Sequence, residues 1–171
     1  MQRITICGNS GSGKSTFSEK LATVSGLPVY HIDLLQFQPG WRKTPAEEFA
    51  KVHNEWLAKP NWIIEGVGDW HPLKKRFEAS DTIIYFDFPV EYCLQNAQER
   101  LEKDKISPNP YIPANSPYAA KADKQEEVIQ FFQKEWRPKI LVLMESLREG
   151  RNLFVLTEPE ALNNFLAENF L

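Results

Sequence analysis

Residues 8–15, GNSGSGKS, are the part of the sequence whose residue types point most directly to chemistry. A glycine, four further residues and then Gly-Lys-Ser form the spacing of a loop that holds the phosphates of a nucleoside triphosphate. Glycines let the backbone curl so that successive N–H groups face phosphate oxygens, and the start of a following helix attracts the same anion. A flexible Gly/Ser turn has a similar composition, but the apolar segment before the loop and the helical spacing after it favour a phosphate loop.

The loop and the turn after it are predicted to bind the nucleotide through Gly8, Asn9, Ser10, Gly11, Ser12, Gly13, Lys14, Ser15 and Thr16. Lys14 has the length to reach the β- and γ-phosphates, and the Ser15 hydroxyl is a ligand suited to Mg²⁺. The nearest match to the guanine-binding pattern of GTPases is AKAD at 120–123, which lacks the first residue and follows no strand. We therefore expect ATP and Mg²⁺ as cofactors, and a small kinase as the class of enzyme.

Two acids at the ends of apolar segments are candidates for the chemistry of the acceptor and the metal. Asp33 ends LPVYHID (27–33), and Glu65 ends the apolar part of NWIIEG (61–66). The carboxyl ends of parallel strands meet beside a phosphate loop, so both acids are expected there. Asp33 can position or deprotonate an acceptor hydroxyl or hold a magnesium-bound water, and Glu65 can do the latter. Capping of the next turn is the alternative for each acid.

Cations that neutralise a transferring phosphoryl group are the next requirement. Asn96 and Arg100 are four residues apart on one predicted helix face, and Arg100 leads into a proline-rich loop. We expect Asn96 to contact the nucleotide and Arg100 to take part in catalysis, with a solvated surface charge as the alternative for Arg100. Arg76 is a weaker candidate for the acceptor site, and Arg137 is a weaker candidate for nucleotide binding.

The stretch PGWR (39–42) places Trp41 beside Arg42 just after the second predicted strand. An aromatic ring beside a cation can frame the ring and the phosphate of an acceptor, although a packed loop tryptophan fits equally well. The same two interpretations apply to Trp70, which follows Gly66 and Gly68. Gly66 is predicted to contact the acceptor.

Other chemistry-bearing residues receive structural interpretations. His31 lies inside a predicted strand and is expected to be a satisfied core histidine, and no Cys or His partners at zinc-ligand spacing surround His53 or His71. Asp87, which ends a third apolar segment, is as well suited to accepting N–H bonds from the loop or the next helix as to catalysis. Phe131, Phe132 and Trp136 are expected in the core.

The whole composition fits one globular domain over residues 1–171. The chain is 42% apolar and 25% charged, with a net charge of −3, which argues against tight nonspecific binding of nucleic acid. Two cysteines are too few for a disulfide framework, so a reduced, cytoplasmic compartment is the default expectation. No apolar run approaches 18 residues, so we expect no membrane span.

The elements that position these residues alternate between strands and helices. Strands are predicted at 2–7, 27–33, 61–66, 81–89 and 152–157, and helices are predicted to begin at Lys14, after a Thr44 cap, at 90, at 122 with a break near Pro138, and after Thr157. This alternation predicts an α/β fold with three layers, in which helices cover both faces of a parallel sheet. Residues 105–121 hold four prolines and no clear period, so we expect a loop there.

The motifs also resemble those of a known family. GNSGSGKST, HIDLLQFQPGW, WIIEGV and ASDTIIYFDFPVEYCL together are similar to the topology modulation protein family, which resembles adenylate kinase and related small P-loop kinases. The resemblance covers residues 1 to about 100 well and the rest loosely. It implies a five-stranded sheet of order 2-3-1-4-5 and a mobile lid at 105–121.

By position, the resemblance assigns phosphate and metal to Lys14 and Ser15, a place near magnesium to Glu65, and the base of the lid to Arg100. The predicted function is therefore transfer of the ATP γ-phosphoryl group to a nucleoside, nucleotide or related small acceptor. The lid between Ile106 and Ala120 contains no arginine, whereas arginines normally clamp a nucleotide acceptor. The alternative is a nucleotide-binding regulator with weak or no turnover, linked only indirectly to DNA topology. Direct binding of nucleic acid is not expected.

Overall fold

A parallel sheet forms the centre of the molecule in a computed structural model that describes residues 1–170. Its order is β2-β5-β1-β6-β7, and every neighbouring pair runs parallel. The strands are β1 (Arg3–Gly8), β2 (Val29–His31), β5 (Trp62–Glu65), β6 (Thr82–Phe86) and β7 (Asn152–Leu156). Counted along the sequence, the five strands of this sheet have the expected order 2-3-1-4-5 across it. A small antiparallel sheet of β3 (Phe37–Gln38) and β4 (Arg42–Lys43) lies between β2 and β5 in the sequence.

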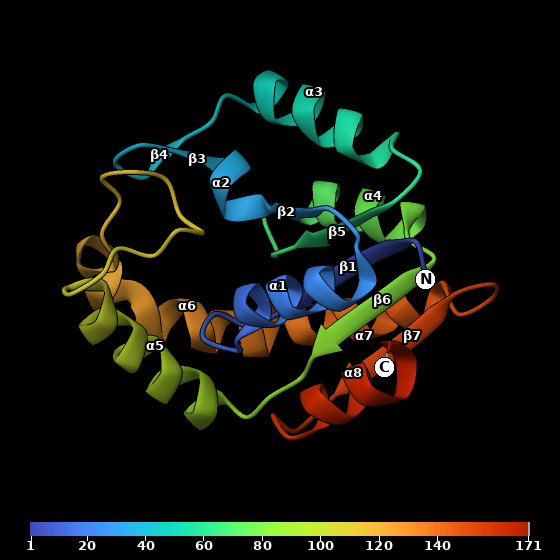
Figure 1. Ribbon diagram of the computed structural model, residues 1–171. Coiled ribbons are helices and arrows are strands. Elements are labelled where there is room, and N and C mark those ends of the chain that lie inside the picture. The colour runs from blue at the N-terminus through green and yellow to red at the C-terminus, as the bar shows by residue number, and fades with distance from the viewer. Residues whose placement is uncertain (171) are drawn as a thin grey trace.

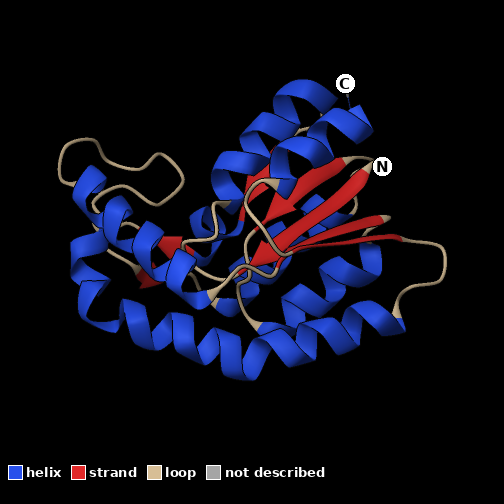
Figure 2. Cartoon of the chain, turned by 90° about the horizontal axis from the view of Figure 1, so that it is seen from below, coloured by secondary structure: helices blue, strands red, loops and turns tan. Residues whose placement is uncertain are grey.

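Helices cover both faces of this sheet, which confirms the three-layer α/β/α fold (Figure 2). One face packs mainly against α1 (Lys14–Ser25), α5 (Val90–Asp104) and α8 (Ala161–Phe170). The other face packs against α3 (Ala46–Leu57), α4 (Trp70–Ala79) and α7 (Arg137–Ser146). No helix among residues 1–170 combines the length and the apolar character that a membrane crossing requires.

Alternation along the strands explains this two-sided burial. On β6, Ile84 and Phe86 belong to the cluster that faces α1, whereas Ile83 and Tyr85 belong to the cluster that faces α4 and α7. Successive side chains of a strand point to opposite faces, so a strand covered on both faces becomes a continuous apolar run. This is why TIIYF could be recognised as a buried parallel strand.

Several element boundaries differ from the predictions. The second strand ends at His31, and Asp33 lies in a short helix, α2 (Ile32–Gln36), that begins at the edge of the sheet. Thr44 does not cap α3, because Pro45 occupies the cap position and the Thr44 hydroxyl donates to the Leu35 carbonyl at 2.7 Å. The Thr44 side chain instead fastens α2 to the start of α3.

The predicted helix 122–148 is helical from Tyr118 to Ser146, and in place of a break near Pro138 its hydrogen-bond pattern changes to a π-helical turn. A 3₁₀ helix, η1 (Tyr118–Lys124), leads into α6 (Gln125–Phe131), a π-helical turn, η2 (Phe132–Trp136), and then α7. Proline at the second position of α7 has no N–H to donate, which favours a break in the hydrogen-bond ladder just before it. Phe132 is buried, but Phe131 is 56% exposed, so its assignment to the core was wrong.

The proline-rich loop is the main irregular segment. Residues 106–117 form no helix or strand. Figure 1 shows this loop, coloured yellow, beside β3 and β4, far from them in sequence. Two backbone N–H groups of the β3–β4 turn, those of Gly40 and Trp41, donate to the Ser116 hydroxyl at 3.0 and 3.1 Å. The loop and the small antiparallel sheet are therefore directly attached.

Candidate active site

The phosphate loop connects β1 to α1 and is held tightly by its neighbours. Gly11 and Gly13 have φ angles of 79° and 87°, a left-handed conformation that favours glycine. A Cβ at Gly8 would lie 2.7 Å from the Phe86 carbonyl oxygen, and one at Gly11 would clash with the Cys93 carbonyl oxygen. The glycines thus serve both the curl of the loop and its close approach to β6 and α5.

Lys14 lies across this loop as the motif requires. Its ammonium donates to the Asn9 carbonyl oxygen at 2.7 Å and to the Ser12 hydroxyl at 3.4 Å. Burial lowers the pKa of Lys14, and the carboxylates of Glu65 and Asp33 oppose that shift. The Asn9 side chain donates to the Ile129 carbonyl oxygen at 2.9 Å, which anchors the loop to α6. A lysine ammonium at a glycine-rich loop that precedes a helix is suited to binding a polyphosphate.

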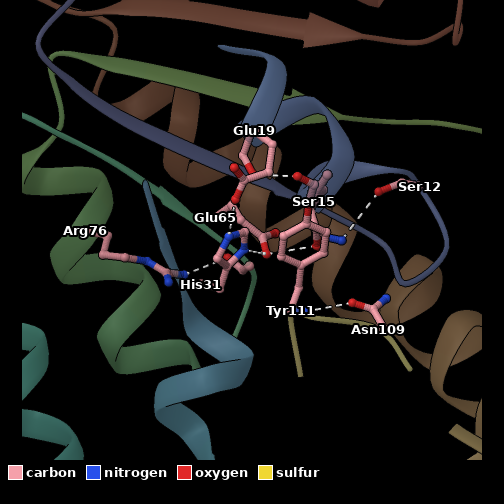
Figure 3. Close-up of polar contacts among 11 residues, drawn as sticks. Ser12, Ser15, Glu19, His31, Glu65, Arg76, Asn109 and Tyr111 are labelled. Carbon is pink, nitrogen blue, oxygen red and sulfur yellow. Dashed lines mark hydrogen bonds and ion pairs between the residues drawn. The ribbon is translucent and has the colours of Figure 1, made fainter. Parts of the chain in front are cut away.

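Glu65 is connected to the loop by a chain of hydrogen bonds, shown in Figure 3. Ser15 Oγ donates to Glu65 Oε1 at 3.0 Å, and the same oxygen lies 2.8 Å from His31 Nδ1. His31 Nε2 lies 2.9 Å from Glu19 Oε1. The Tyr111 ring stacks on the His31 ring with centroids 4.7 Å apart, so the loop 106–117 covers this series of hydrogen bonds.

The hydrogen-bonded groups His31, Glu65 and Glu19 stabilise one another's charged forms. Burial alone would lower the pKa of His31, but hydrogen bonds and charges from Glu65 and Glu19 outweigh burial and raise it. Burial would raise the pKa of Glu65, but the bond to His31 and the charge of Lys14 outweigh burial and lower it. Glu65 is therefore held as a carboxylate beside the Ser15 hydroxyl. These are two oxygen ligands of the kind that Mg²⁺ takes.

Two cavities meet at the phosphate loop. A smaller cavity of about 390 Å³ lies among the loop, α5 and the proline-rich segment. A larger cavity of about 770 Å³ lies among the loop, the β3–β4 turn, α6 and η2. Five residues line both: Lys14, Ser15, Arg100, Tyr111 and Tyr118. A group bound at the loop would therefore be reachable from either cavity.

Asp33 lines the larger cavity. Burial and the nearby charge of Glu65 raise the pKa of Asp33, while Lys14, Lys121 and Arg100 act in the opposite direction. No side-chain hydrogen bond to the Asp33 carboxyl group occurs within residues 1–170. A partly buried carboxyl group that lines a cavity is a candidate to accept a hydrogen bond or a proton from a bound molecule.

Arg100 and Asn96 reach the phosphate loop from α5. Asn96 Nδ2 donates to the Gly11 carbonyl oxygen at 2.9 Å, and Arg100 Nη2 donates to the Ser10 hydroxyl at 3.2 Å. The Arg100 guanidinium also lies over the Tyr118 ring, 4.0 Å from its centroid. These contacts place a cation between the two cavities, next to the phosphate loop.

Three other predicted arginines lie outside both cavities. Arg76 is fully buried, and its Nη2 donates to the carbonyl oxygens of Gly66 and Val67 at 2.9 and 2.7 Å. Arg137 forms a bidentate ion pair with Asp87, at 2.6 and 2.8 Å. Arg42 is exposed, and its Nε donates to the Pro39 carbonyl oxygen at 3.4 Å. Each guanidinium contacts other groups of the chain, and the roles of these arginines at the acceptor or the nucleotide stay predictions.

The remaining predictions for the acceptor side fit the geometry. Trp41 and Gly66 line the larger cavity, and Trp41 Nε1 donates to the Pro117 carbonyl oxygen at 3.0 Å. His31 is buried and satisfied, as predicted for a core histidine, yet both of its partners are acids at the site. Asp87 has a structural partner in Arg137.

Sequence reasoning did not identify Lys121, Tyr111, Tyr118 or Glu19 as site residues. Lys121 sits in η1, and its ammonium lies 3.9 Å from the centroid of the Phe37 ring and 3.6 Å from that of the Trp41 ring. The only sequence signal was its place at the end of the proline-rich segment, because cation–aromatic contacts across 80 residues leave no pattern in the sequence.

Comparison with solved structures places the fold. A shikimate kinase from Acinetobacter baumannii, in complex with shikimate, is similar with a TM-score of 0.59 and 18% identity, over 98% of this chain and 90% of that chain. A gluconokinase from Sinorhizobium meliloti has a TM-score of 0.53 and 14% identity, over 99% and 89%. A sugar kinase from Janibacter has a TM-score of 0.52 and 16% identity, over 98% and 93%.

These likenesses show that the chain has the fold of small P-loop kinases, and their low identities show the fold alone. No model of a known family matches the chain, and no curated protein matches its sequence. The resemblance to the topology modulation protein family therefore stays a prediction from the motifs.

Proposed function

We propose that the chain is a phosphotransferase that moves the γ-phosphoryl group of ATP to a hydroxyl group of a small acceptor, with Mg²⁺. The observation that carries this proposal is the position of the phosphate loop between two cavities that share Lys14, Ser15 and Arg100. One cavity has room for the nucleotide. The other contains Asp33, a carboxylate suited to an acceptor hydroxyl.

The proposed transfer uses these residues in distinct roles. The triphosphate binds along the loop from Gly8 to Lys14, and the acceptor hydroxyl faces Asp33. Its oxygen forms a bond to the γ-phosphorus, the bond to the β-phosphate oxygen breaks, and the hydroxyl proton passes to Asp33. Lys14 and Arg100 neutralise the negative charge on the transferred group and on the departing ADP.

The metal site fits the residues present. The Ser15 hydroxyl and the Glu65 carboxylate, 3.0 Å apart, are oxygen ligands on neighbouring elements. Mg²⁺ held there would neutralise phosphate charge. The bond from His31 to Glu65 orients the carboxylate, as groups behind a metal ligand commonly do.

A direct test is phosphoryl transfer across a panel of acceptors. The panel includes shikimate, gluconate and sugars, because similar folds are named as kinases of such compounds, and nucleosides and nucleotides, because the motifs suggest them. Product is measured by mass spectrometry together with ADP. We expect product with at least one acceptor, loss of product in Lys14→Ala, and a fall of about 10²–10⁴-fold in kcat in Asp33→Asn.

Binding of Mg·ATP provides the control. Asp33→Asn should keep the rise in Tm that Mg·ATP produces, because Asp33 faces the acceptor and not the loop. A folded protein that binds Mg·ATP but gives no product with any acceptor would contradict the kinase proposal. It would favour a nucleotide-binding regulator, for which a protein partner is the next search.

A further inference from the structure

Lys121 and Lys124 are the cations that line the larger cavity but not the smaller one, and Lys121 is the less exposed of the two. Lys14 and Arg100 line both cavities and lie at the phosphate loop, whereas Lys121 lines the larger cavity alone. No ion pair to Lys121 occurs within residues 1–170. Its ammonium is held instead over the faces of Phe37 and Trp41, at 3.9 and 3.6 Å from the ring centroids.

The position of Lys121 is fixed before any ligand arrives. The Ser116 hydroxyl accepts from the N–H groups of Gly40 and Trp41, and the Trp41 indole donates to the Pro117 carbonyl oxygen. These bonds join the β3–β4 turn to the segment that leads into η1. Contact with aromatic faces stabilises a partly buried ammonium and leaves its N–H groups free to donate elsewhere.

The rest of the cavity wall is largely apolar. Side chains from three segments contribute to it, namely the loop after β5, α6 and η2: Val67, Val128, Phe131, Phe132 and Trp136. Val128 and Phe131 are 52% and 56% exposed, which is unusual for large apolar side chains that line a cavity. A flat or ring-shaped molecule would cover them, and exposed apolar surface beside a few convergent polar groups is typical of a ligand site.

The charged residues of the cavity then limit which charged groups a bound ligand can have. Asp33 and Lys121 both line the cavity, and no ion pair to Asp33 occurs within residues 1–170. Asp123 and Lys124, of opposite charge, are exposed where η1 borders the cavity. A hydroxyl directed at Asp33 leaves Lys121 for an anionic group elsewhere on the same molecule.

We propose that the acceptor is a hydroxylated ring compound with one anionic group, a carboxylate or a phosphate monoester, and that Lys121 binds this group. The inference rests on the proposed function, because it assigns the larger cavity to the acceptor. Lys121 is then the residue that determines acceptor charge. The proposal narrows the earlier range of nucleosides, nucleotides and metabolites to the anionic members.

The test is calorimetric titration with three probes that share one ring: 4-hydroxybenzoate, 4-hydroxyphenyl phosphate and neutral 4-hydroxybenzamide, each with Mg·ADP present. We expect at least one anion to bind tenfold or more tightly than the amide. Lys121→Met should abolish that difference, and Lys121→Arg should retain it. The matched control is Lys134→Met, which removes the same charge at an exposed position that lines neither cavity and should keep the preference.

Equal affinity for the three probes overturns the proposal, and so does an undiminished preference for the anion in Lys121→Met. Failure of both anionic probes to bind, in protein that binds Mg·ADP, also overturns it. Failure of the kinase proposal has a different signature, since then no acceptor of any charge gives product. Phosphorylation of neutral acceptors alone would leave the kinase standing and remove the role of Lys121.

Discussion

Glu65 shows how much of the site depends on the surroundings of single residues. Its carboxylate is 3% exposed, and an isolated buried carboxylate would tend to take up a proton. His31 and Ser15 both contact the same oxygen, and His31 is in turn held by Glu19. Two segments of the chain, α1 and β2, thus keep Glu65 ionised and oriented.

His31→Gln should destabilise the fold in a pH-dependent way. The pKa of His31 is raised in the folded protein above its ordinary 6.5, so its contribution is complete below that value and declines as pH rises through the raised pKa. The pKa of Glu65 is lowered below its ordinary 4.5, so its contribution is lost only as pH falls below that value. The loss of unfolding free energy should be about 1–3 kcal/mol near pH 5.5 and smaller near pH 8.5.

Urea denaturation at the two pH values measures this difference. The control is Lys20→Gln, which removes an exposed charge on α1 and should show no pH-dependent loss. An equal loss in His31→Gln at both pH values would mean that the imidazole acts only as a packed ring.

At the scale of elements, the turn from β1 into α1 depends on two glycines with different constraints. Gly11 and Gly13 both have positive φ, but only a Cβ at Gly11 meets a neighbour, the Cys93 carbonyl oxygen of α5. Gly11→Ala must push the loop away from α5 or break it. In Gly13→Ala the added Cβ meets nothing within 4 Å, so the variant is destabilised only by the left-handed backbone conformation.

Gly13→Ala should therefore cost about 1–2 kcal/mol of unfolding free energy, and Gly11→Ala should cost about 3 kcal/mol or more. Gly11→Ala should also lose the rise in Tm with Mg·ATP, while Gly13→Ala keeps part of it. Thermal unfolding of both variants with and without Mg·ATP is the measurement. Similar costs for the two would show that the loop moves freely against α5.

Ser116 is the element-scale link between the proline-rich loop and the β3–β4 turn. It is 2% exposed and accepts two backbone N–H groups, so Ser116→Ala leaves the amides of Gly40 and Trp41 without an acceptor. We expect a loss of about 1–3 kcal/mol and at least tenfold faster hydrogen exchange at those amides. Ser107→Ala, an exposed serine of the same loop, is the matched control. Unchanged exchange in Ser116→Ala would show that the Trp41 indole alone holds the two segments together.

The elements were predictable from the sequence to the extent that their signals are local. The buried strand at 82–86 and the phosphate loop could both be recognised because each pattern lies in consecutive residues. Thr44 was misassigned as a cap because its hydroxyl bonds to Leu35, a partner that only the folded chain brings near. The helix that contains Asp33 has one and a half turns, too few for a periodic pattern.

The arginines show the same limit for the site. Arg76 and Arg100 both follow a strand of the sheet by a similar distance, yet one is buried under Gly66 and Val67 and the other reaches the phosphate loop. Residue type and spacing do not distinguish these roles, because burial depends on packing between distant segments. Lys121 was missed for the same reason.

Across the whole molecule, the sheet is tied to the helical segment that walls the larger cavity. Asp87 follows β6, and Arg137 begins α7, directly after the π-helical turn that carries Phe132 and Trp136. Figure 2 shows α6, η2 and α7 as one long run of helix along the sheet. Asp87 is 8% exposed and Arg137 is 39% exposed, so solvent screens the pair only partly.

A double-mutant cycle on Asp87→Asn and Arg137→Met measures this link. Their coupling should be about 1 kcal/mol, because one partner is partly exposed, and the double variant should lose less than the sum of the single losses. Both residues lie outside the cavities, so the rise in Tm with Mg·ATP should persist in all three variants. If Arg137→Met alone abolished that rise, Arg137 would be a nucleotide ligand after all, and its pairing with Asp87 would have to break when the nucleotide binds.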